Sequence, residues 1–506
     1  MSVAPPPPRP APARRRWRRG PADVALAAVW AMAAAWAGLF AGLSVARHHA
    51  FWTGRFDVGN MVQAVWSTAQ GRPLETTDIA GRQFSRLGAH VDPILALFTP
   101  LAWTGALPEA LLVAQAVIVA SGALPAFWLG RRWLGDDRLA VAAAAVWLLY
   151  PPVGWATVTE FHPVTLAAPL LLFCIWAAEE RRPVVLGVCA ALAVLCKEEV
   201  GLAVALIGGW MVVRGLGRRY GVALALLATA WVAFAVGVVI PRFNDGRPSA
   251  FIGRYGTLGD DAGDVAVTLL TRPWEAAEVL WSYDRLSYLG ALLLPLALLP
   301  LAAPALLAVA APEVLINVLA DWFPQYSIEY QYVAVIAPVA VAAAILGLAR
   351  VRRARRPALL ARAVADPGRT AVAWVAIVAL SGVYLGPLPL WRDLAPVGYS
   401  GERADQYRGG PHADAMARAV ALVPDDVPVS AGNLLGSHLS ERERILTFPV
   451  VGEAQWVLTD ERRPYVGDLL SRSAHAEHLR RLRARGDMRL VFEEDGVMVF
   501  RRGAGA

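Results

Sequence analysis

The sequence predicts a mainly α-helical polytopic membrane protein, a bundle of about eleven spans, followed by a small C-terminal α/β domain. Of the 506 residues, 57% are hydrophobic and only 18% are charged, and the mean hydropathy is +0.44. This composition excludes an ordinary soluble protein. Long apolar runs alternate with short arginine-rich connectors, and after residue 390 the charge density rises and the pattern becomes that of a soluble domain.

The chain begins with a Pro/Arg-rich stretch, and we expect residues 1–20 to form a disordered cytoplasmic tail. The apolar run from Val24 to Ala46 is long enough for the roughly 20 residues that cross a bilayer, so it predicts a retained first span rather than a cleaved signal. The arginines between Arg14 and Arg19 place the N-terminus in the cytoplasm.

Arginine-rich connectors fix the predicted topology of the transmembrane bundle, residues 21–390. Connectors at 131–138, 179–182, 214–219 and 350–369 should be cytoplasmic. Spans that satisfy this rule are roughly 24–46, 109–130, 138–152, 164–178, 184–196, 200–213, 221–241, 289–304, 306–320, 331–349 and 371–390. The apolar piece 94–103 is too short to cross and is predicted to be interfacial or re-entrant. The C-terminus is then extracytoplasmic, in a multi-pass protein of the cytoplasmic membrane.

The predicted topology places nearly every interesting polar residue outside the membrane. The large outer loops are 47–108 and 242–288, and shorter outer turns lie at 150–163, around 197–199 and at 321–330. Residues 391–506 form the predicted soluble extracytoplasmic domain. There, strands are expected at 427–431, 456–459, 488–493 and 497–501, and helices at 412–423 and 475–485.

Asp57 is the first candidate for chemistry. It opens an amphipathic helix in which Val58, Met61, Val62 and Val65 share one face, and a helix of this kind is expected to lie in the membrane interface, apolar side down. A carboxylate is costly near lipid and needs a reason. One reason is a helix N-cap, and the other is a functional acid; the two roles are compatible.

Glu160 and His162 form the second candidate, in the turn E-F-H-P before a predicted span. Such a turn glutamate is commonly only solvated, and Pro163 is a normal helix start. An acid and an imidazole at a span entrance could also bind a metal or a phosphate. Asp57, Glu160 and His162 are therefore the metal candidates, and the cofactor prediction is either none or a divalent metal.

Lys197 and Glu198 interrupt a stretch of about thirty otherwise nearly uncharged residues. The pair could neutralise itself at a hairpin tip, but a lysine at the outer surface is also a natural partner for a lipid-linked phosphate. His90 and Asp92 give a weak H-x-D metal pattern. Tyr332 belongs to a polar, aromatic outer loop that could line a sugar pocket or belong to the aromatic belt.

The remaining composition excludes several protein classes. The three cysteines lie inside apolar segments, so neither a disulfide framework nor a cysteine metal site is expected. The net charge of +7 resides mainly in connectors that set orientation, and no nucleic-acid partner is expected. The sequence does not indicate an oligomeric state.

Several fragments together resemble a known family. They are F-D-V-G-N-M-V-Q-A-V-W-S-T-A-Q-G-R-P, L-G-A-H-V-D-P-I-L, L-P-A-F-W-L-G-R-R, E-F-H-P, L-C-K-E-E-V-G-L, R-Y-G-T-L-G and Y-S-I-E-Y-Q-Y. In content and order they resemble a bacterial family of multi-pass membrane proteins, the domain of unknown function 2079, over roughly residues 50–460. The family often carries a histidine where this chain has Gln331.

That family is similar in architecture to the GT-C glycosyltransferases, which include protein mannosyltransferases and lipid A aminoarabinose transferases. The resemblance implies that Asp57 is the first-loop acid, a base or acceptor-orienting group. It implies that Glu160 is a second acid and that Lys197 lies near the lipid phosphate. The single glutamate of E-F-H-P departs from a paired acidic motif and leaves metal dependence open.

The resulting hypothesis is a membrane glycosyltransferase that uses a polyprenyl-phosphate-linked sugar donor at the outer face. Lys197, with Arg254 or a metal, would stabilise the leaving phosphate, and Asp57 would take or orient the acceptor proton. The wider predicted binding set is His90, His162, Glu198 and Tyr332. The alternative is a transporter, a flippase or a non-catalytic cell-envelope assembly protein. A transporter should show polar spans and internal repeats, whereas these spans are rich in Ala, Leu and Val.

Overall fold

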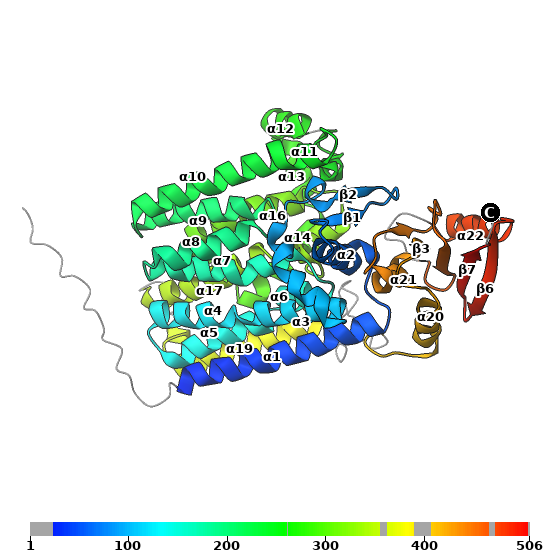
Figure 1. The fold of residues 1–506 in the computed structure, drawn as a ribbon. Helices are drawn as coiled ribbons and strands as arrows, with labels where there is room; N and C mark the ends of the chain where they lie inside the picture. Colours follow the sequence, from blue (N-terminus) through cyan, green and yellow to red (C-terminus); the bar gives the residue numbers. More distant parts are fainter. Residues whose placement is uncertain (1–23, 261, 355–361, 389–405, 465–470, 504–506) are drawn as a thin grey trace, which may run out of the picture.

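Long, roughly parallel helices form one body of the molecule, and a small α/β domain is attached at one end (Figure 1). This computed structural model describes residues 24–260, 262–354, 362–388, 406–464 and 471–503. The predicted tail 1–20 therefore lies outside the described residues, as do 389–405, where the predicted C-terminal domain begins.

The bundle helices follow the apolar runs of the sequence. They are α1 (Val24–His49), α3 (Leu107–Ala120), α4 (Ala123–Leu134), α5 (Asp137–Leu149), α6 (Pro151–Val158), α7 (Pro163–Glu179), α8 (Pro183–Val194), α9 (Val200–Arg214), α10 (Arg218–Phe234), α11 (Ile240–Phe243), α14 (Tyr283–Leu293), α15 (Pro304–Leu307), α16 (Ala311–Val318), α17 (Ile336–Arg353) and α19 (Pro367–Leu385). Several begin with proline, whose fixed φ suits the first turn of a helix. Gly135 and Gly215 end α4 and α9 in the left-handed conformation, with φ of 70° and 68°.

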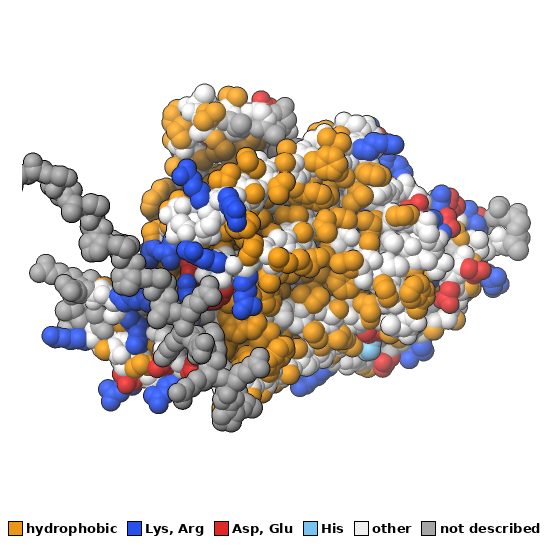
Figure 2. Space-filling model, turned by 60° about the vertical axis from the view of Figure 1, so that its left-hand side comes forward, with side chains coloured by type: hydrophobic (Ala, Val, Ile, Leu, Met, Phe, Trp, Pro, Cys, Tyr) orange, Lys and Arg blue, Asp and Glu red, His pale blue; other side chains and the backbone are white. Residues whose placement is uncertain are grey.

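Four of the described helical stretches are long and apolar enough to cross a membrane: Val24–His49, Leu107–Leu134, Arg218–Phe243 and Pro367–Leu385. A fifth is obtained if the bent pair α5 and α6 counts as one span. The other predicted spans coincide with shorter helical segments, so the number of spans stays a prediction. A broad band of hydrophobic side chains covers the flank of the bundle, with Lys and Arg gathered beyond one edge of the band (Figure 2).

Charged connectors meet at one end of the bundle, which we call the arginine end. Arg214 lies 3.2 Å from Glu179, and Arg353 donates to the carbonyl oxygen of Trp133 at 2.7 Å. These contacts join the ends of α7, α9, α17 and α4. The opposite end, called the domain end, is where the C-terminal domain is attached (Figure 1).

Between α1 and α3 the chain forms a compact outer layer at the domain end. It contains the π-helical turn η1 (Arg55–Gly59), α2 (Asn60–Ala69), the hairpin β1 (Glu75–Thr77) and β2 (Gln83–Ser85), and the 3-10 helix η3 (Pro93–Thr104). The apolar face of α2 was expected to rest on lipid. Instead, Met61, Val62 and Val65 are buried in the protein core, because η3 packs beside α2 and supplies the apolar partner.

The C-terminal domain is a five-stranded mixed sheet with a helix on each face. Strand order is β4-β3-β5-β7-β6, with β3 parallel to β4 and β5, and with β7 antiparallel to β5 and β6. The strands are β3 (Val429–Ala431), β4 (Ile445–Thr447), β5 (Trp456–Asp460), β6 (Met488–Glu494) and β7 (Val497–Arg502); the helices are α20 (Pro411–Ala421), α21 (Asn433–Gly436) and α22 (Arg472–Arg483). α20 packs on the face of Leu458 and Val499, whereas α22 packs on the face of Val457 and Phe500.

Candidate active site

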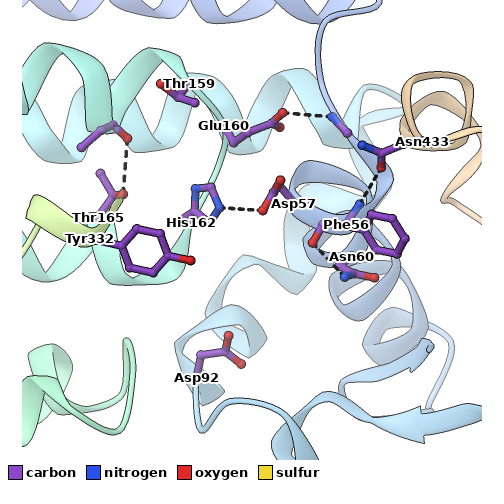
Figure 3. A network of polar contacts seen from close by, with 12 residues as sticks. Phe56, Asp57, Asn60, Asp92, Thr159, Glu160, His162, Thr165, Tyr332 and Asn433 are labelled. Atoms are coloured by element: carbon purple, nitrogen blue, oxygen red, sulfur yellow. Dashed lines mark hydrogen bonds and ion pairs between the residues drawn. The ribbon is translucent and has the colours of Figure 1, made fainter. Parts of the chain in front are cut away.

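Asp57 lies at the domain end with its carboxylate turned toward His162 (Figure 3). Its Oδ1 is 3.0 Å from Nε2 of His162, a residue 105 positions later in the chain. The Asp57 side chain is 42% exposed and that of His162 only 8%. The histidine therefore fixes one carboxylate oxygen from the protein side while the carboxyl group remains reachable from outside.

The N-cap role considered for Asp57 is not what the structure shows. No side-chain cap hydrogen bond is made at the start of η1 or of α2. Glu160 performs that task from another part of the chain, since its Oε1 accepts a hydrogen bond from the backbone N–H of Gly54 at 3.0 Å. The capping acid is thus supplied by the turn that precedes α7.

Glu160 and Asp57 have different environments although they are neighbours (Figure 3). Glu160 is buried. Burial, and after it the negative charge of Asp57, raises the pKa of the Glu160 carboxyl well above its usual range. The environment of Glu160 therefore favours the protonated form of its carboxyl.

Gln115 holds the Glu160 turn in place and was not identified from the sequence. It is fully buried in α3. Its Nε2 donates to the carbonyl oxygens of Thr157 and Glu160 at 3.0 and 2.6 Å, and its Oε1 accepts from the N–H of His162 at 2.9 Å. The feature of the sequence that could have identified Gln115 is that it is a single glutamine within an apolar helix.

The C-terminal domain supports the backbone that carries Asp57. Asn433 accepts a hydrogen bond from the N–H of Phe56 at 3.2 Å. Gly54 leaves room for this contact, because a Cβ there would lie 2.8 Å from the Asn433 amide nitrogen. Arg55 is buried and donates to the carbonyl oxygens of Thr77 and Ile445 at 2.6 and 2.7 Å.

A second group of charged residues lies around Lys197 at the same end. Lys197 is 2.5 Å from Glu199, and Glu198 is 3.0 Å from His90 and accepts from the N–H of Val91 at 2.8 Å. Burial would lower the pKa of Lys197, but the nearby carboxylates outweigh it and raise that pKa, so the lysine stays charged. Glu313, which was not identified from the sequence, also contributes to this field. Lys197 is therefore already neutralised by acids.

Arg254 has a different setting. Its guanidinium donates to the hydroxyl of Tyr332 at 3.1 Å and to Gln325 at 3.4 Å. Aromatic rings surround it, with centroids 4.5 Å away for Phe251, 5.1 Å for Trp322 and 5.7 Å for Tyr332. Within the described ranges no carboxylate is paired with it.

Tyr332 connects the two groups. Its ring lies 5.7 Å from the Lys197 ammonium, its hydroxyl accepts from Arg254, and it stands beside His162 in the close view (Figure 3). The loop before it is tied to the Glu160 turn, since Thr159 donates to the carbonyl oxygen of Glu329 at 2.8 Å. The structure thus gathers the predicted residues at one end of the bundle, with Asp57, Glu160 and His162 in direct contact or adjacent.

The predicted metal ligands are not arranged as a metal centre. Across the described part of the chain no group of three or more His, Cys, Asp or Glu side chains is placed to hold an ion. In the H-x-D pattern the two residues have separate partners: His90 faces Glu198, and Asp92 pairs with Arg86 at 2.7 Å.

The chain was compared with curated proteins, solved structures and protein families, and the family comparison shows where it belongs. No curated protein matches the chain. Among solved structures, it is similar to ArnT from Cupriavidus metallidurans bound to undecaprenyl phosphate, at 13% identity and a TM-score of 0.49, over 96% of this chain and 99% of that one. The apo state of the same protein gives 14% identity and a TM-score of 0.48, over 92% and 98%.

The oligosaccharyltransferase from Archaeoglobus fulgidus tethered to an acceptor peptide is similar at 13% identity and a TM-score of 0.44, over 92% of this chain and 74% of that one. With TM-scores below 0.5, these likenesses are too weak to assign a function. The family model matches residues 47–499, which is most of the chain, and a match of this extent shows the family. The chain belongs to the family described as predicted membrane protein (DUF2079).

Proposed function

We propose that this protein is a membrane glycosyltransferase that moves a sugar from a polyprenyl-phosphate carrier to an acceptor hydroxyl at the outer face of the cytoplasmic membrane. One observation carries the proposal. One end of an apolar helical bundle holds both a half-exposed carboxylate fixed by a histidine and an arginine that has no acidic partner in the described residues.

The reaction needs these two kinds of group. The acceptor oxygen forms a bond to the anomeric carbon of the sugar, and the bond from that carbon to the phosphate oxygen breaks. The acceptor proton passes to Asp57, and the phosphate leaves with the electron pair. A general base and a cation that stabilises the leaving charge therefore act on opposite sides of the transferred sugar.

Asp57 is the proposed base because it is the accessible acid of the pair. Its Oδ1 is held by His162, which orients the carboxyl group toward the open side. Glu160 is buried and holds the Gly54 N–H, and burial raises the pKa of its carboxyl. We assign Glu160 a positioning role: through its hydrogen bond from the N–H of Gly54 it shapes the turn that carries Asp57.

Arg254 is the proposed phosphate ligand, with the Tyr332 hydroxyl beside it. A guanidinium offers several donors to a phosphate and stacks on aromatic rings, as this one does. Lys197 was the sequence-based choice, but it is already paired with Glu199. Its proposed role is to hold the Tyr332 ring and to balance the acids around it, while Glu198 fixes His90.

The test is the cell-envelope lipid and glycan profile of a strain that lacks the gene. Loss of the transferase should remove a glycan modification and leave the sugar-loaded polyprenyl phosphate accumulated. Wild-type protein should restore the profile and Asp57→Asn should not, at equal membrane abundance by immunoblot. Asp414→Asn, an exposed acid on α20, is the matched control and should restore it fully. An unchanged lipid-linked sugar pool in the deletion strain would contradict the proposal.

A further inference from the structure

A short helix in the outer loop between α11 and α14 exposes large apolar side chains. It is α12 (Ala262–Thr271), and its last seven residues, V-A-V-T-L-L-T, include no charged side chain. Val265 and Leu269 pack on the core of the bundle. On the other side of the helix, Val267 is 56% exposed and Leu270 is 83% exposed. The helix is therefore apolar both on the side that meets the protein and on the side that does not.

The next helix, α13 (Pro273–Leu280), has the pattern of an interfacial helix. Trp274 is 57% exposed, and Trp281, directly after the helix, is 76% exposed. These tryptophans are seven positions apart and so share one face, whereas Glu275 and Glu278 lie to one side of it. Tryptophan is enriched at the level of the lipid headgroups, where its ring meets the apolar region and its N–H meets water.

Helix α12 projects from the flank of the bundle (Figure 1), and hydrophobic side chains cover much of the visible face of this lobe at the top of Figure 2. Along the bundle axis it lies level with the stretch of α10 and α11, where Arg218–Phe243 is a candidate membrane span. Exposed apolar residues also cover that span, among them Leu226, Leu227 and Phe234. The exposed side of α12 therefore continues the hydrophobic surface of a span.

We propose that residues 262–281, here called the anchor segment, are seated in the outer leaflet of the lipid bilayer. Val267 and Leu270 would lie among acyl chains, and Trp274 and Trp281 at the headgroups. A helix that is apolar all round is buried in a protein core or in a membrane, and the described residues bury only one side of α12. Lipid is the occupant that its position favours, because the neighbouring hydrophobic surface belongs to a span.

The anchor segment is closely joined to the loop that carries Arg254. Gly259 packs against the first turn of α12, where a Cβ on the glycine would lie 2.6 Å from the Cβ of Asp264. Asp321 holds the same loop twice: it accepts from the N–H of Thr257 at 2.9 Å, and its own N–H donates to the carbonyl oxygen of Arg254 at 2.7 Å. The depth of the anchor segment therefore constrains the Arg254 loop. The importance of that constraint for transfer rests on the proposed function, whereas the seating in lipid does not.

The experiment measures the depth of residue 270 in the full-length protein in nanodiscs. Leu270→Cys carries a fluorescent label in a Cys189→Ala background, because Cys174 and Cys196 are buried and Cys189 is only partly so. The two quenchers are phosphatidylcholine with brominated acyl chains and iodide in the water. Since an interfacial helix buries its apolar face about 5–10 Å into the boundary of headgroups and acyl chains, brominated lipid should reduce the emission by about half and iodide should have little effect.

Two labelled control variants calibrate the measurement. Phe234→Cys, on the exposed face of the α10 span, reports contact with lipid, and Arg489→Cys, an exposed position of β6 in the C-terminal domain, reports contact with water. Quenching of the Leu270→Cys label by brominated lipid to the level of the Phe234→Cys label supports the proposal. Quenching by iodide to the level of the Arg489→Cys label would place α12 in water, and protection from both quenchers would place it against a second copy of the chain. Either of these results would overturn the proposal.

Discussion

At the arginine end of the bundle, charged side chains contact helix ends and a neighbouring turn, whereas at the domain end acids and histidines lie together at the proposed site. Arg131 pairs with Asp137 across a short turn, and Arg350 and Arg353 donate to carbonyl oxygens at 2.9 and 2.7 Å. At the domain end, Asp57 meets His162 and His90 meets Glu198 across 105 and 108 residues. Arginines that donate to carbonyl oxygens at helix ends stabilise those ends, and basic residues in connectors set orientation. The domain end instead brings acids and histidines from different segments together, which fits the site proposed above.

The contrast between the two ends would fail most completely if both lay on the same side of the membrane. We predict that reporter fusions ending at Arg218 and at Arg485 lie on opposite sides of the membrane, because the first follows α9 at the arginine end and the second belongs to the C-terminal domain. An alkaline phosphatase and a fluorescent protein reporter at each point would measure it. Cytoplasmic signals from both positions would refute an outward-facing site.

The largest catalytic effect is expected for Asp57→Asn. The asparagine keeps the size and one oxygen for His162 but cannot take a proton, so transfer should fall by about 10²–10⁴-fold, the typical contribution of a general base. The turnover rate in membranes of equal protein content gives the measurement. Rates within a factor of three of wild type would leave Asp57 with a purely structural role.

Substitutions of Arg254 and Lys197 should have different effects, the first on use of the lipid-linked donor and the second on stability. Arg254→Gln keeps a donor for Tyr332 but removes the charge, and use of the lipid-linked donor should weaken by about 10–100-fold at normal abundance. Lys197→Met leaves Glu199 and Glu198 uncompensated in a poorly exposed place, and the folded state should lose on the order of 3–5 kcal/mol. Immunoblots and donor titrations separate the two effects. The reverse pattern would restore Lys197 as the phosphate ligand.

Glu160→Gln should have a small effect on activity. Burial raises the pKa of the Glu160 carboxyl, so its environment favours an uncharged side chain, and the glutamine amide oxygen can still accept from the N–H of Gly54. We expect a loss of no more than about tenfold, the value of one neutral hydrogen bond. Glu160→Ala leaves the N–H without its acceptor and should lower abundance. An inactive but abundant Glu160→Gln protein would instead make Glu160 a direct participant.

The smallest effect is expected at the arginine end. Asp137 is 61% exposed in its pair with Arg131, and such surface pairs contribute roughly 0–1 kcal/mol. Arg131→Gln should therefore leave transfer unchanged and shift the melting temperature only slightly, as measured by thermal unfolding in detergent. A large loss of activity at normal abundance would show that this end also takes part in function.

Local signals carried most of the fold. Apolar runs and proline starts located the bundle helices, and strand patterns located β3, β5, β6 and β7. β4 and the strands of the β1–β2 hairpin, which have three residues each, as β3 has, were not identified. The site could be predicted only in part. Asp57 and Glu160 stand out as acids beside apolar runs, but which of them is accessible depends on burial that no local pattern records.

The residues that support the candidate site could not be identified from local sequence patterns, for the same physical reason. The roles of Gln115 and Asn433 depend on partners that are distant in the sequence. Gln115 bonds to His162, 47 residues away, and Asn433 bonds to Phe56, 377 residues away. In the sequence Arg55 is an ordinary loop arginine, and only the fold shows that it donates to the carbonyl oxygen of Ile445. Single polar residues within apolar segments, such as Gln115 and Glu313, were the one general signal that pointed toward this network.

The hydrogen bond between Phe56 and Asn433 has a consequence for biosynthesis. Chains are made from the N-terminus at about 5–20 residues per second, so the Asp57 loop leaves the ribosome long before its support, which follows 377 residues later. The loop gains this hydrogen bond only when the C-terminal domain has folded beside it. A truncated chain that ends before Asn433 lacks that support, so the backbone beside Asp57 is held in place only once nearly the whole chain has been made.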